Sequence, residues 1–192
     1  MLVVGAGIGG LTTALELHRA RISCRVAEAA AAFAPAGVGI NILPHAARQL
    51  GELGLEGRLS PRAVLTRESV FYNRFGQFIY AEPAGRAAGY PDPQYSIHRA
   101  DLHEVLLGAV TERLGAGAVS TGHRVTRVDQ DHRHAIAHVE RADGTMIDLE
   151  ADVVIAADGI HSAVRAQLFP GEGPPRYCGV TMWRGVSVWP PS

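Results

Sequence analysis

The chain has 192 residues, of which 47% are hydrophobic, and its formal net charge at pH 7 is −1. This size and composition are typical of one or two globular domains with a sizeable core. A near-neutral charge without a basic block argues against nucleic acid or an anionic membrane as a partner, and no apolar run approaches the length of a membrane span. Cys24 and Cys178 form neither a disulfide framework nor a metal-binding spacing, which favours a cytoplasmic protein.

The N-terminal stretch, residues 2–10, carries the strongest signal in the chain. A short apolar strand leads into the spacing G-x-G-x-x-G, and an amphipathic helix follows at once, which is the context that a dinucleotide-binding site requires. Gly5 allows the tight turn, Gly7 lets the backbone approach a pyrophosphate, and Gly10 lets the helix lie against the strand. Unpaired N–H groups at the helix start then face the anion. The expected cofactor-binding residues of this turn are Gly5, Gly7, Ile8, Gly9 and Gly10.

Glu28 ends the second expected strand, residues 23–28, and lies 18 positions beyond Gly10 (28 − 10). That distance is close to the roughly 20 residues at which this fingerprint places an acidic side chain. Such a carboxylate accepts hydrogen bonds from the hydroxyls of an adenosine ribose and repels a 2′-phosphate. The alternative is a solvated strand end. The combination predicts an ADP-containing cofactor.

Between residues 37 and 93, a glycine-containing segment is followed by a helical pattern and then by the alternating pattern of strands. Gly37 and Gly39 around Val38 suggest backbone packed against something flat or bulky, and a helix is expected from Pro44 to about Gly54. Residues 69–75 and 78–82 then alternate with a period of two around a Gly-Gln turn, which predicts a hairpin, and residues 83–93 are expected to form a loop.

The second half of the chain begins with a helix expected to start at Asp101, with Glu104 three residues on, as in a capping box. Four strands follow, over residues 123–130, 134–141, 145–149 and 152–157, the last apolar on both faces as in a central parallel strand. A short helix is expected over 162–168, a linker over 170–175 and a further strand over 179–188. His132, His134 and His138 lie on a polar hairpin and are interpreted as solvated, with no metal site and no catalytic side chain assigned.

Asp158 and Gly159 leave the carboxyl end of the last apolar strand, where ligands of open α/β sheets bind. The alternative is an ordinary strand-to-helix turn. With Ser162 and Arg165 they complete the pattern D-G-x-x-S-x-x-R. Together with the N-terminal glycines, this pattern resembles the FAD-dependent aromatic hydroxylases of the p-hydroxybenzoate and salicylate hydroxylase type.

The resemblance implies an α/β fold: a Rossmann-like FAD-binding domain with an interleaved β-rich substrate domain, truncated. The expected boundaries are 1–66 and 95–175 for the FAD-binding domain and 67–94 and 176–192 for strands of the substrate domain. By the same resemblance Asp158, Gly159 and Arg165 contact the FAD. The arginine that many relatives carry before the Gly-x-Gly-Ile segment is absent here, where the sequence has 33–36 as Phe-Ala-Pro-Ala.

Other cofactor contacts are assigned on the same basis. Arg99 is expected beside the phosphates or ring of the flavin, since a cation at a helix start opposes the helix dipole and is better explained by a negative partner. The alternative is a surface arginine that pairs with Asp101 or Glu104. The remaining expected cofactor-binding residues are Gly37, Val38, Gly39 and Val125.

The activity implied by the resemblance is that of a monooxygenase. NAD(P)H reduces the flavin, O2 forms a flavin C4a-hydroperoxide, and a small aromatic substrate is hydroxylated. The runs at 37–42, 93–99 and 181–186 look most like phenazine-modifying hydroxylases, and Trp183 with Arg184 suggests a planar, anionic substrate. The alternatives are an inactive fragment, a nucleotide-binding relative or a nicotinamide-dependent dehydrogenase.

The downstream Gly-Asp motif of these hydroxylases has no match after Arg165, so the chain resembles an N-terminal half. An incomplete sheet leaves apolar surface and strand edges uncovered. We therefore expect these residues alone to aggregate or to bind FAD weakly, and not to hydroxylate.

Overall fold

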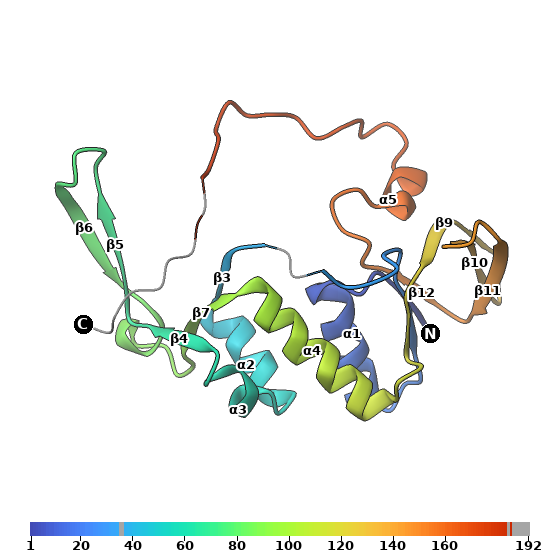
Figure 1. The fold of residues 1–192 in the computed structure, drawn as a ribbon, viewed down its shortest axis with the longest axis horizontal. Helices are drawn as coiled ribbons and strands as arrows, with labels where there is room; N and C mark the ends of the chain where they lie inside the picture. Colours follow the sequence, from blue (N-terminus) through green and yellow to red (C-terminus); the bar gives the residue numbers. More distant parts are fainter. Residues whose placement is uncertain (35–36, 184, 186–192) are drawn as a thin grey trace. The chain divides into compact units, whose positions relative to one another are not determined.

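The computed structural model describes residues 1–34, 37–183 and 185 (Figure 1). It confirms the expected α/β class, with helices, parallel strands and antiparallel strands in one chain. The chain divides into two compact units, which we describe separately. The first contains residues 1–35 and 106–181, and the second contains residues 36–105 and 182–192.

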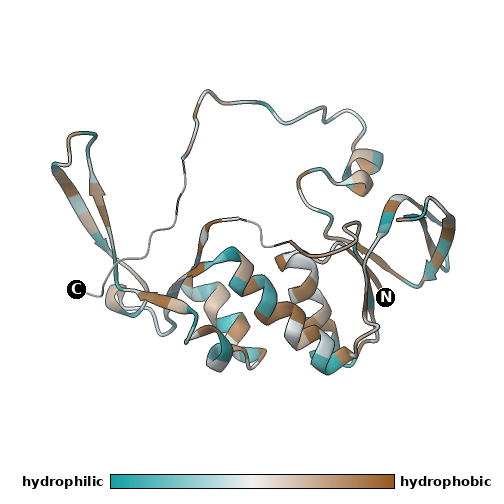
Figure 2. Ribbon diagram, in the orientation of Figure 1, coloured by the Kyte–Doolittle hydropathy of each residue, from teal (hydrophilic) through white to brown (hydrophobic). Residues whose placement is uncertain are grey.

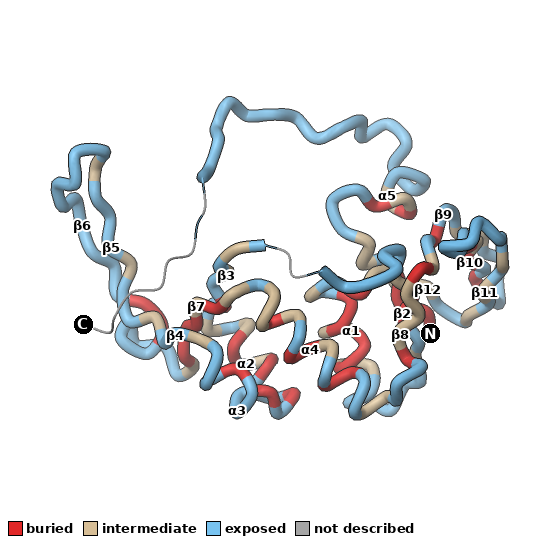
Figure 3. Tube along the Cα trace, viewed as in Figure 1, coloured by how far each residue is buried: buried red, intermediate tan, exposed pale blue. Residues whose placement is uncertain are grey.

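The first unit is built on a parallel sheet with the strand order β12-β1-β2-β8. Its strands are β1 (Leu2–Val4), β2 (Arg25–Ala27), β8 (Val119–Ser120) and β12 (Val154–Ala156). Helix α1 (Ile8–Arg19) connects β1 to β2, and its buried residues, Leu11, Ala14 and Leu15, recur at the spacing of one helical face (Figure 3). All three residues of β1 are buried, because the strand is paired on both sides.

An antiparallel sheet of order β11-β10-β9 completes the first unit. It contains β9 (His123–Gln130), β10 (Ala135–Arg141) and β11 (Met146–Ala151). Val125, Ala137 and Val139 form a buried cluster with Leu2 and Val4 of the parallel sheet, so the two sheets share one core. The short helix α5 (Ala163–Leu168) contributes Val164 to that cluster.

The second unit is organised around the three strands β3 (Gly39–Ile42), β7 (Gln94–His98) and β4 (Ala63–Thr66), in that order and all antiparallel. Ile42, Tyr95 and Ile97 are buried on this sheet. Helices α2 (Pro44–Glu52) and α3 (Glu56–Leu59) and a single 3-10 turn, η1 (Gly85–Ala88), complete it with residues 99–105 of α4 (Arg99–Leu114). Pro44 takes the first helical position of α2, as the sequence predicts.

The hairpin of β5 (Glu68–Tyr72) and β6 (Phe78–Pro83) is the most exposed part of the second unit (Figure 3). Phe71 stacks on Tyr80 with their ring centroids 4.5 Å apart, and Tyr72 meets Phe78 edge to face. Hydrophobic residues lie along both strands (Figure 2), yet all four rings remain exposed. Two paired strands alone are marginally stable in water, so these cross-strand ring contacts are a main source of cohesion for the hairpin.

Three expected elements differ in the structure. Helix α4 begins at Arg99 and not at Asp101, because β7 runs directly into it and the Ala100 N–H donates to Nδ1 of His98 at 3.2 Å. The expected capping box is therefore wrong. Glu104 pairs instead with Arg62 at 3.0 Å.

Strand β12 is not central. Within the described residues it pairs with β1 alone, which leaves Val153 beside it 42% exposed. The strand expected over 179–188 is also wrong for its described residues, 179–183 and 185, which are irregular and pair with no other strand. His132 and His134 lie in the turn between β9 and β10, and not on a strand as expected.

Within the described part of the chain, no helix combines the length and apolar character needed to cross a bilayer. The boundaries of the FAD-binding and substrate domains given above stay a prediction.

Candidate functional site

The turn between β1 and α1 is packed so tightly that two of its glycines cannot carry a side chain. Gly5 has a φ of +96°, and a Cβ there would lie 2.5 Å from the carbonyl oxygen of Ala157. A Cβ on Gly10 would lie 1.8 Å from the carbonyl oxygen of Gly5. Both distances are far below van der Waals contact. The packing tasks predicted for Gly5 and Gly10, the tight turn and the close helix–strand approach, are therefore seen in the structure.

Gly7 and Gly9 differ from their neighbours, because a Cβ on either would meet nothing within 4 Å. Gly7 caps α1 with extended backbone (φ −72°, ψ −178°) and no side-chain cap, and its carbonyl accepts from Leu11 N–H. Ile8 follows as the first helical residue and is half-buried. Among the described residues, no contact requires a glycine at position 7. The open space lies at the N-terminus of a twelve-residue helix, where N–H groups favour an anion.

Glu28 lies directly after β2, and its carboxylate bonds to two backbone N–H groups. Oε2 accepts from Ala6 N–H at 2.7 Å, and Oε1 accepts from Ala30 N–H at 2.8 Å. The first bond ties the second strand to the glycine turn. Each carboxylate oxygen has two acceptor positions, so both can still accept a hydroxyl of a ligand. Glu28 therefore supports the turn and remains available to a ribose.

The second motif spans the loop between β12 and the first turn of α5, and its side chains bond to the start of that helix and to neighbouring residues. Asp158 Oδ2 accepts from Ala163 N–H at 2.9 Å, and Ser162 Oγ accepts from Arg165 N–H at 2.9 Å. The Arg165 guanidinium donates to Ile160 O at 2.6 Å and pairs with Glu172 at 2.9 Å. Gly159 takes a φ of +81°, which an L residue rarely adopts. The loop itself accounts for the conformation of all four motif residues.

One cavity of about 340 Å³ joins the two turns within the first unit. Its volume is at the lower end of the range for small-molecule sites. The residues that line it are Val4, Gly5, Gly7, Ala27, Glu28, Ala29, His123, Arg124, Val125, Ala157, Asp158, Gly159, His161 and Ala163. The structure thus places Gly5, Gly7, Glu28, Val125, Asp158 and Gly159 around one cavity, and their binding of a cofactor stays a prediction.

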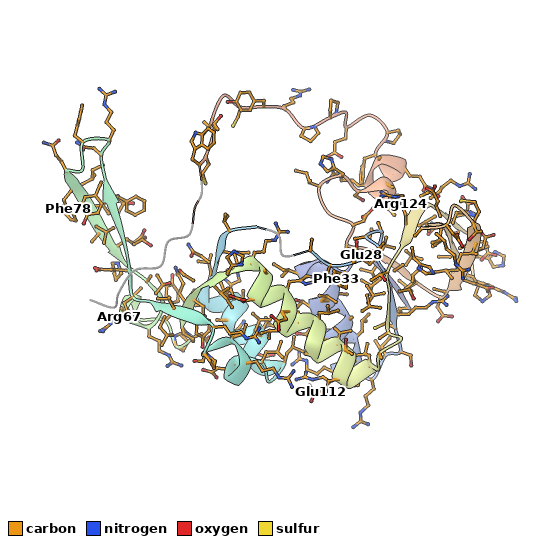
Figure 4. All side chains as sticks on the ribbon, in the orientation of Figure 1. Glu28, Phe33, Arg67, Phe78, Glu112 and Arg124 are labelled. Carbon is orange, nitrogen blue, oxygen red and sulfur yellow. The ribbon has the colours of Figure 1, made fainter. Side chains whose placement is uncertain are left out.

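Arg124 was not singled out from the sequence. It lies on β9 beside Val125, and its side chain is exposed with no hydrogen bond or ion pair to the described residues (Figure 4). Its position in the cavity adds a cation to a site otherwise lined by Glu28 and Asp158. In the sequence, the one indication of a role for Arg124 is its place next to Val125. Neighbouring residues on a strand point to opposite faces, so a buried Val125 leaves Arg124 facing outward. Val125 itself is buried in the core.

In the second unit, Gly37 and Val38 contact Arg99. Gly37 has a φ of +102°, and the Arg99 N–H donates to Val38 O at 3.0 Å. The bulky group expected beside Gly37 is therefore the side chain of Arg99. Gly39 begins β3 and a Cβ there would meet nothing within 4 Å. Trp183 is 92% exposed, and Arg184 lies outside the described residues.

Of the three histidines expected to be solvated, only His138 lies on a strand, β10 of the antiparallel sheet. His138 lies between two carboxylates, with Nε2 3.0 Å from Asp129 and Nδ1 2.8 Å from Asp148. These hydrogen bonds, the one to Asp129 first, raise the pKa of His138. Among residues 1–34, 37–183 and 185, no three His, Cys, Asp or Glu side chains form a group that could hold a metal ion.

Comparison with known proteins extends over almost the whole chain. A family model described as an FAD binding domain matches residues 1–181. Phenazine 1,6-dicarboxylic acid hydroxylase PhzS from Lysobacter antibioticus is 44% identical over 190 residues, which cover 97% of this chain and 47% of the relative. The 3-amino-4-hydroxybenzoate 2-monooxygenase PtmB3 from Streptomyces platensis is 42% identical over 191 residues, covering 96% of this chain and 45% of the relative.

A solved structure is similar over most of the chain. The crystal structure of p-nitrophenol 4-monooxygenase PnpA from Pseudomonas putida DLL-E4 matches with a TM-score of 0.79 and 25% identity, covering 87% of this chain and 42% of that one. The chain therefore spans a little under half the length of the curated relatives that it matches.

Proposed function

From the premise that this chain belongs to the FAD binding domain family, we propose that it holds FAD in an enzyme that hydroxylates a small aromatic substrate. One structural observation supports this most directly. The glycine at position 7 has no packing partner, and the space that a side chain would fill lies open at the start of α1. A pyrophosphate fits that position, because it needs close backbone approach and N–H donors.

The chain's own residues fit the adenosine half of the cofactor. The free N–H groups at the start of α1 would bond to the pyrophosphate oxygens, and the Glu28 carboxylate would accept from the ribose hydroxyls. Because Glu28 is already held by Ala6 and Ala30, its oxygens are oriented before the ligand arrives. Arg124, in the same cavity, would add a positive charge near the phosphates.

When bound, FAD supplies two-electron redox chemistry and the activation of O2. The residues of this chain have the other tasks: they bind the cofactor, fix its orientation and limit its contact with water. The cofactor contacts assigned to Asp158, Gly159 and Arg165 remain proposals, supported by the place of Asp158 and Gly159 in the cavity.

A titration tests the cofactor proposal. Calorimetric titration of the purified protein with FAD, FMN, NAD⁺ and NADP⁺ should show that FAD binds more tightly than the other three, even where its affinity is weak. Preference for FAD over FMN is expected because the cavity recognises the ADP moiety that FMN lacks. Tight binding of NAD⁺ without FAD would contradict the proposal and support a nicotinamide-dependent dehydrogenase.

For the substrate, we propose a planar aromatic carboxylate of the phenazine type, with NAD(P)H as the reductant. The proposal is supported by the runs that resemble 5-methylphenazine-1-carboxylate 1-monooxygenase and by the 44% identity to a phenazine dicarboxylic acid hydroxylase. Trp183, exposed and aromatic, and Arg184 are the proposed substrate contacts.

The substrate proposal is tested by nicotinamide oxidation in the FAD-loaded protein. Phenazine-1-carboxylate should stimulate NADH or NADPH oxidation more than salicylate, and salicylate more than phenol. Equal stimulation by all three compounds would contradict a phenazine-type substrate and leave only the broader aromatic class.

A further inference from the structure

The second unit contains a cavity of about 520 Å³ between the start of α2, the end of the β5–β6 hairpin and the loop that leads into β7. We call it the α2 cavity. Its volume is within the range of small-molecule sites. All of the residues that line it lie between positions 41 and 94, so the second unit alone forms it. It shares no residue with the cavity around the glycine turn, which the first unit forms.

Gln94 is the unusual residue of the α2 cavity. It is 8% exposed, yet its side-chain amide forms no hydrogen bond with any residue that the structure describes. Ser162, which is equally buried, bonds to Arg165 N–H. Among the described residues, no side-chain nitrogen or oxygen that is sealed from solvent lacks a hydrogen-bond partner. The Gln94 amide must therefore reach one of the two recesses that it borders, the α2 cavity or a smaller one beside β4.

Asn41 presents a second amide on the same face of the β3–β7–β4 sheet. It pairs with Ser96, which is two positions from Gln94 on β7, so the three side chains share one face. Asn41 Oδ1 accepts from Ser96 Oγ at 2.8 Å, which turns the oxygen toward Ser96 and leaves the NH2 group for another partner. Asn41 lines the α2 cavity and not the smaller recess. The α2 cavity is therefore the place where both amides are available to one ligand.

The loop that closes the α2 cavity is fixed by contacts within the protein. Gly85 has a φ of +56°, and a Cβ there would lie 2.6 Å from the backbone nitrogen of Gln94, so the loop packs directly on β7. Tyr90 N–H donates to Gly85 O at 3.3 Å, and Arg86 Nε donates to Pro91 O at 3.3 Å. A site that is already formed loses less conformational freedom when it binds a ligand.

The other residues that line the α2 cavity indicate the kind of ligand. Leu43 and Tyr90 are 46% and 56% exposed and, with three prolines, supply apolar surface on which a flat ring can pack. The ionisable lining residues are two bases and two acids, so no excess of positive charge selects an anion: His45, Arg48, Glu82 and Asp92. A neutral ligand fits better. The Gln94 amide offers a C=O acceptor and an NH2 donor side by side, and its natural complement is a group with the same pair.

We propose that the α2 cavity binds a small planar lactam, a flat heterocycle with adjacent C=O and N–H groups in the ring. The ring C=O accepts from the NH2 group of Gln94, the ring N–H donates to the Gln94 oxygen, and the Asn41 NH2 group is a second donor to the ring C=O. The apolar part of the ring packs against Tyr90. This site does not depend on the proposed binding of FAD, because the second unit alone forms it.

The test compares three probes: 2-quinolone, N-methyl-2-quinolone and quinoline. Each is titrated into the purified 192-residue protein, and binding is followed by NMR of the side-chain amide groups. 2-Quinolone should bind about tenfold more tightly than the other two, because N-methylation removes the ring donor and quinoline lacks both the donor and the C=O. It should also shift the NH2 resonances of Gln94 and Asn41.

Two variants remove the amides separately. Asn41→Asp keeps an acceptor for Ser96 Oγ and should fold normally, but it lacks the NH2 group. Gln94→Leu keeps a side chain of similar size and removes the amide. Each should bind 2-quinolone about tenfold more weakly than the wild type. Gln49→Leu is the matched control, because Gln49 also lies in the second unit, on α2, but does not line the cavity, so its affinity should stay at the wild-type value.

Three results would overturn the proposal. The first is equal binding of 2-quinolone and its N-methyl derivative, or no binding of either. The second is wild-type affinity for 2-quinolone in folded Asn41→Asp, the variant that decides if Gln94→Leu does not fold. The third is tighter binding of quinoline-2-carboxylate than of 2-quinolone, which would show that the cavity selects an anion. None of these results bears on FAD, since a protein that fails to bind FAD can still bind 2-quinolone in its second unit.

Discussion

Two neighbouring turns in the first unit are built in opposite ways. The turn after β1 is made of glycines and leaves an open space at Gly7, whereas the turn after β12 contains side chains that accept from backbone N–H groups at the start of α5. Both follow adjacent parallel strands and line the same cavity. Both turns also match family motifs. Hydrogen bonds within the protein explain the conformation of Asp158 and Ser162, whereas packing within the protein does not explain why residue 7 is a glycine.

The difference shows how a motif residue can be assigned to the fold or to a ligand. Gly5 and Gly10 are required by contacts that would otherwise be clashes, so their presence says little about a ligand. Gly7 and Gly9 have no such contact, and Gly7 is the stronger indication of a ligand because it caps α1, where N–H groups favour an anion. Glu28 serves both the fold and a ligand. Its carboxylate accepts from two backbone N–H groups of the protein, and its oxygens can still accept hydrogen bonds from a ligand. Variants at Gly10, Glu28, Asp158 and Gly7 test these assignments.

Gly10→Ala should have the largest effect. Its Cβ would lie 1.8 Å from the carbonyl oxygen of Gly5, so α1 must move away from the turn, at a cost of about 3 kcal/mol in the free energy of unfolding. Urea denaturation of the FAD-free protein measures this. Gly9→Ala is the control, because it sits one position earlier in open space and should gain at most about 1 kcal/mol from better helix propensity. Equal stability of the two variants would contradict the packing described for Gly10.

Glu28→Gln should be next. Ala6 and Ala30 donate to different oxygens of Glu28, and glutamine replaces one of these oxygens with an NH2 group that would face a backbone donor. The FAD-free protein should therefore lose about 1–3 kcal/mol of stability. Thermal unfolding with and without FAD separates the two roles of Glu28. If the variant loses FAD affinity but no stability without FAD, the hydrogen bonds to the turn contribute nothing.

Asp158→Ala should cost about 0.5–1.5 kcal/mol, because the Ala163 N–H at the start of α5 loses its hydrogen-bond acceptor. Asp158→Asn keeps an acceptor for Ala163 N–H and should retain most of the stability. FAD titrations of both variants then measure whether Asp158 contacts the cofactor, separately from its effect on stability. If Asp158→Asn retains stability and still binds FAD poorly, Asp158 contacts the cofactor, and the contrast between the two turns is smaller than described here.

The smallest effect on stability is expected for His138, which lies on β10 of the antiparallel sheet and belongs to neither turn. Hydrogen bonds to Asp129 and Asp148 raise its pKa above the ordinary value of 6.5. Its contribution to stability is therefore complete below pH 6.5 and is lost as the pH rises through the folded-state pKa. The pKa of Asp129 is lowered, first by the bond to His138, so its contribution is lost only in acid.

The measurement for His138 is the melting temperature across pH 5 to 9. The wild type should lose stability above pH 6.5 relative to His138→Gln, whose curve should be flatter there, while FAD affinity should be equal in both at pH 6. A parallel pH dependence in the two proteins would show that His138 does not contribute.

The sequence alone predicted much of the first unit, because its signals are local. The apolar run 2–4, the glycine spacing and the helical stripe through Leu11 and Leu15 together indicate one strand–turn–helix unit. The hairpin over β5 and β6 was likewise confirmed, since alternation and a glycine turn are both short-range patterns. The short helix expected over 162–168 is also found, as α5 over Ala163–Leu168.

What could not be predicted depends on contacts between distant segments. The start of α4 at Arg99 follows from the pairing of β7 with β3, more than fifty residues earlier. The bond from Ala6 to Glu28 and the packing of Arg99 against Gly37 need two segments in register, which no local pattern specifies. Arg124 enters the cavity only because β9 lies beside it.

Gly7→Ser is the most direct test that the open space at the start of α1 is a cofactor site. Serine is a favourable N-terminal cap and accepts the φ of −72° found at Gly7, so the FAD-free variant should be at least as stable as the wild type. Its side chain would occupy the space assigned to the pyrophosphate, and we predict that FAD affinity falls at least about tenfold, which corresponds to ~1.4 kcal/mol. A Gly7→Ser protein that folds normally and binds FAD as tightly as the wild type would contradict the account.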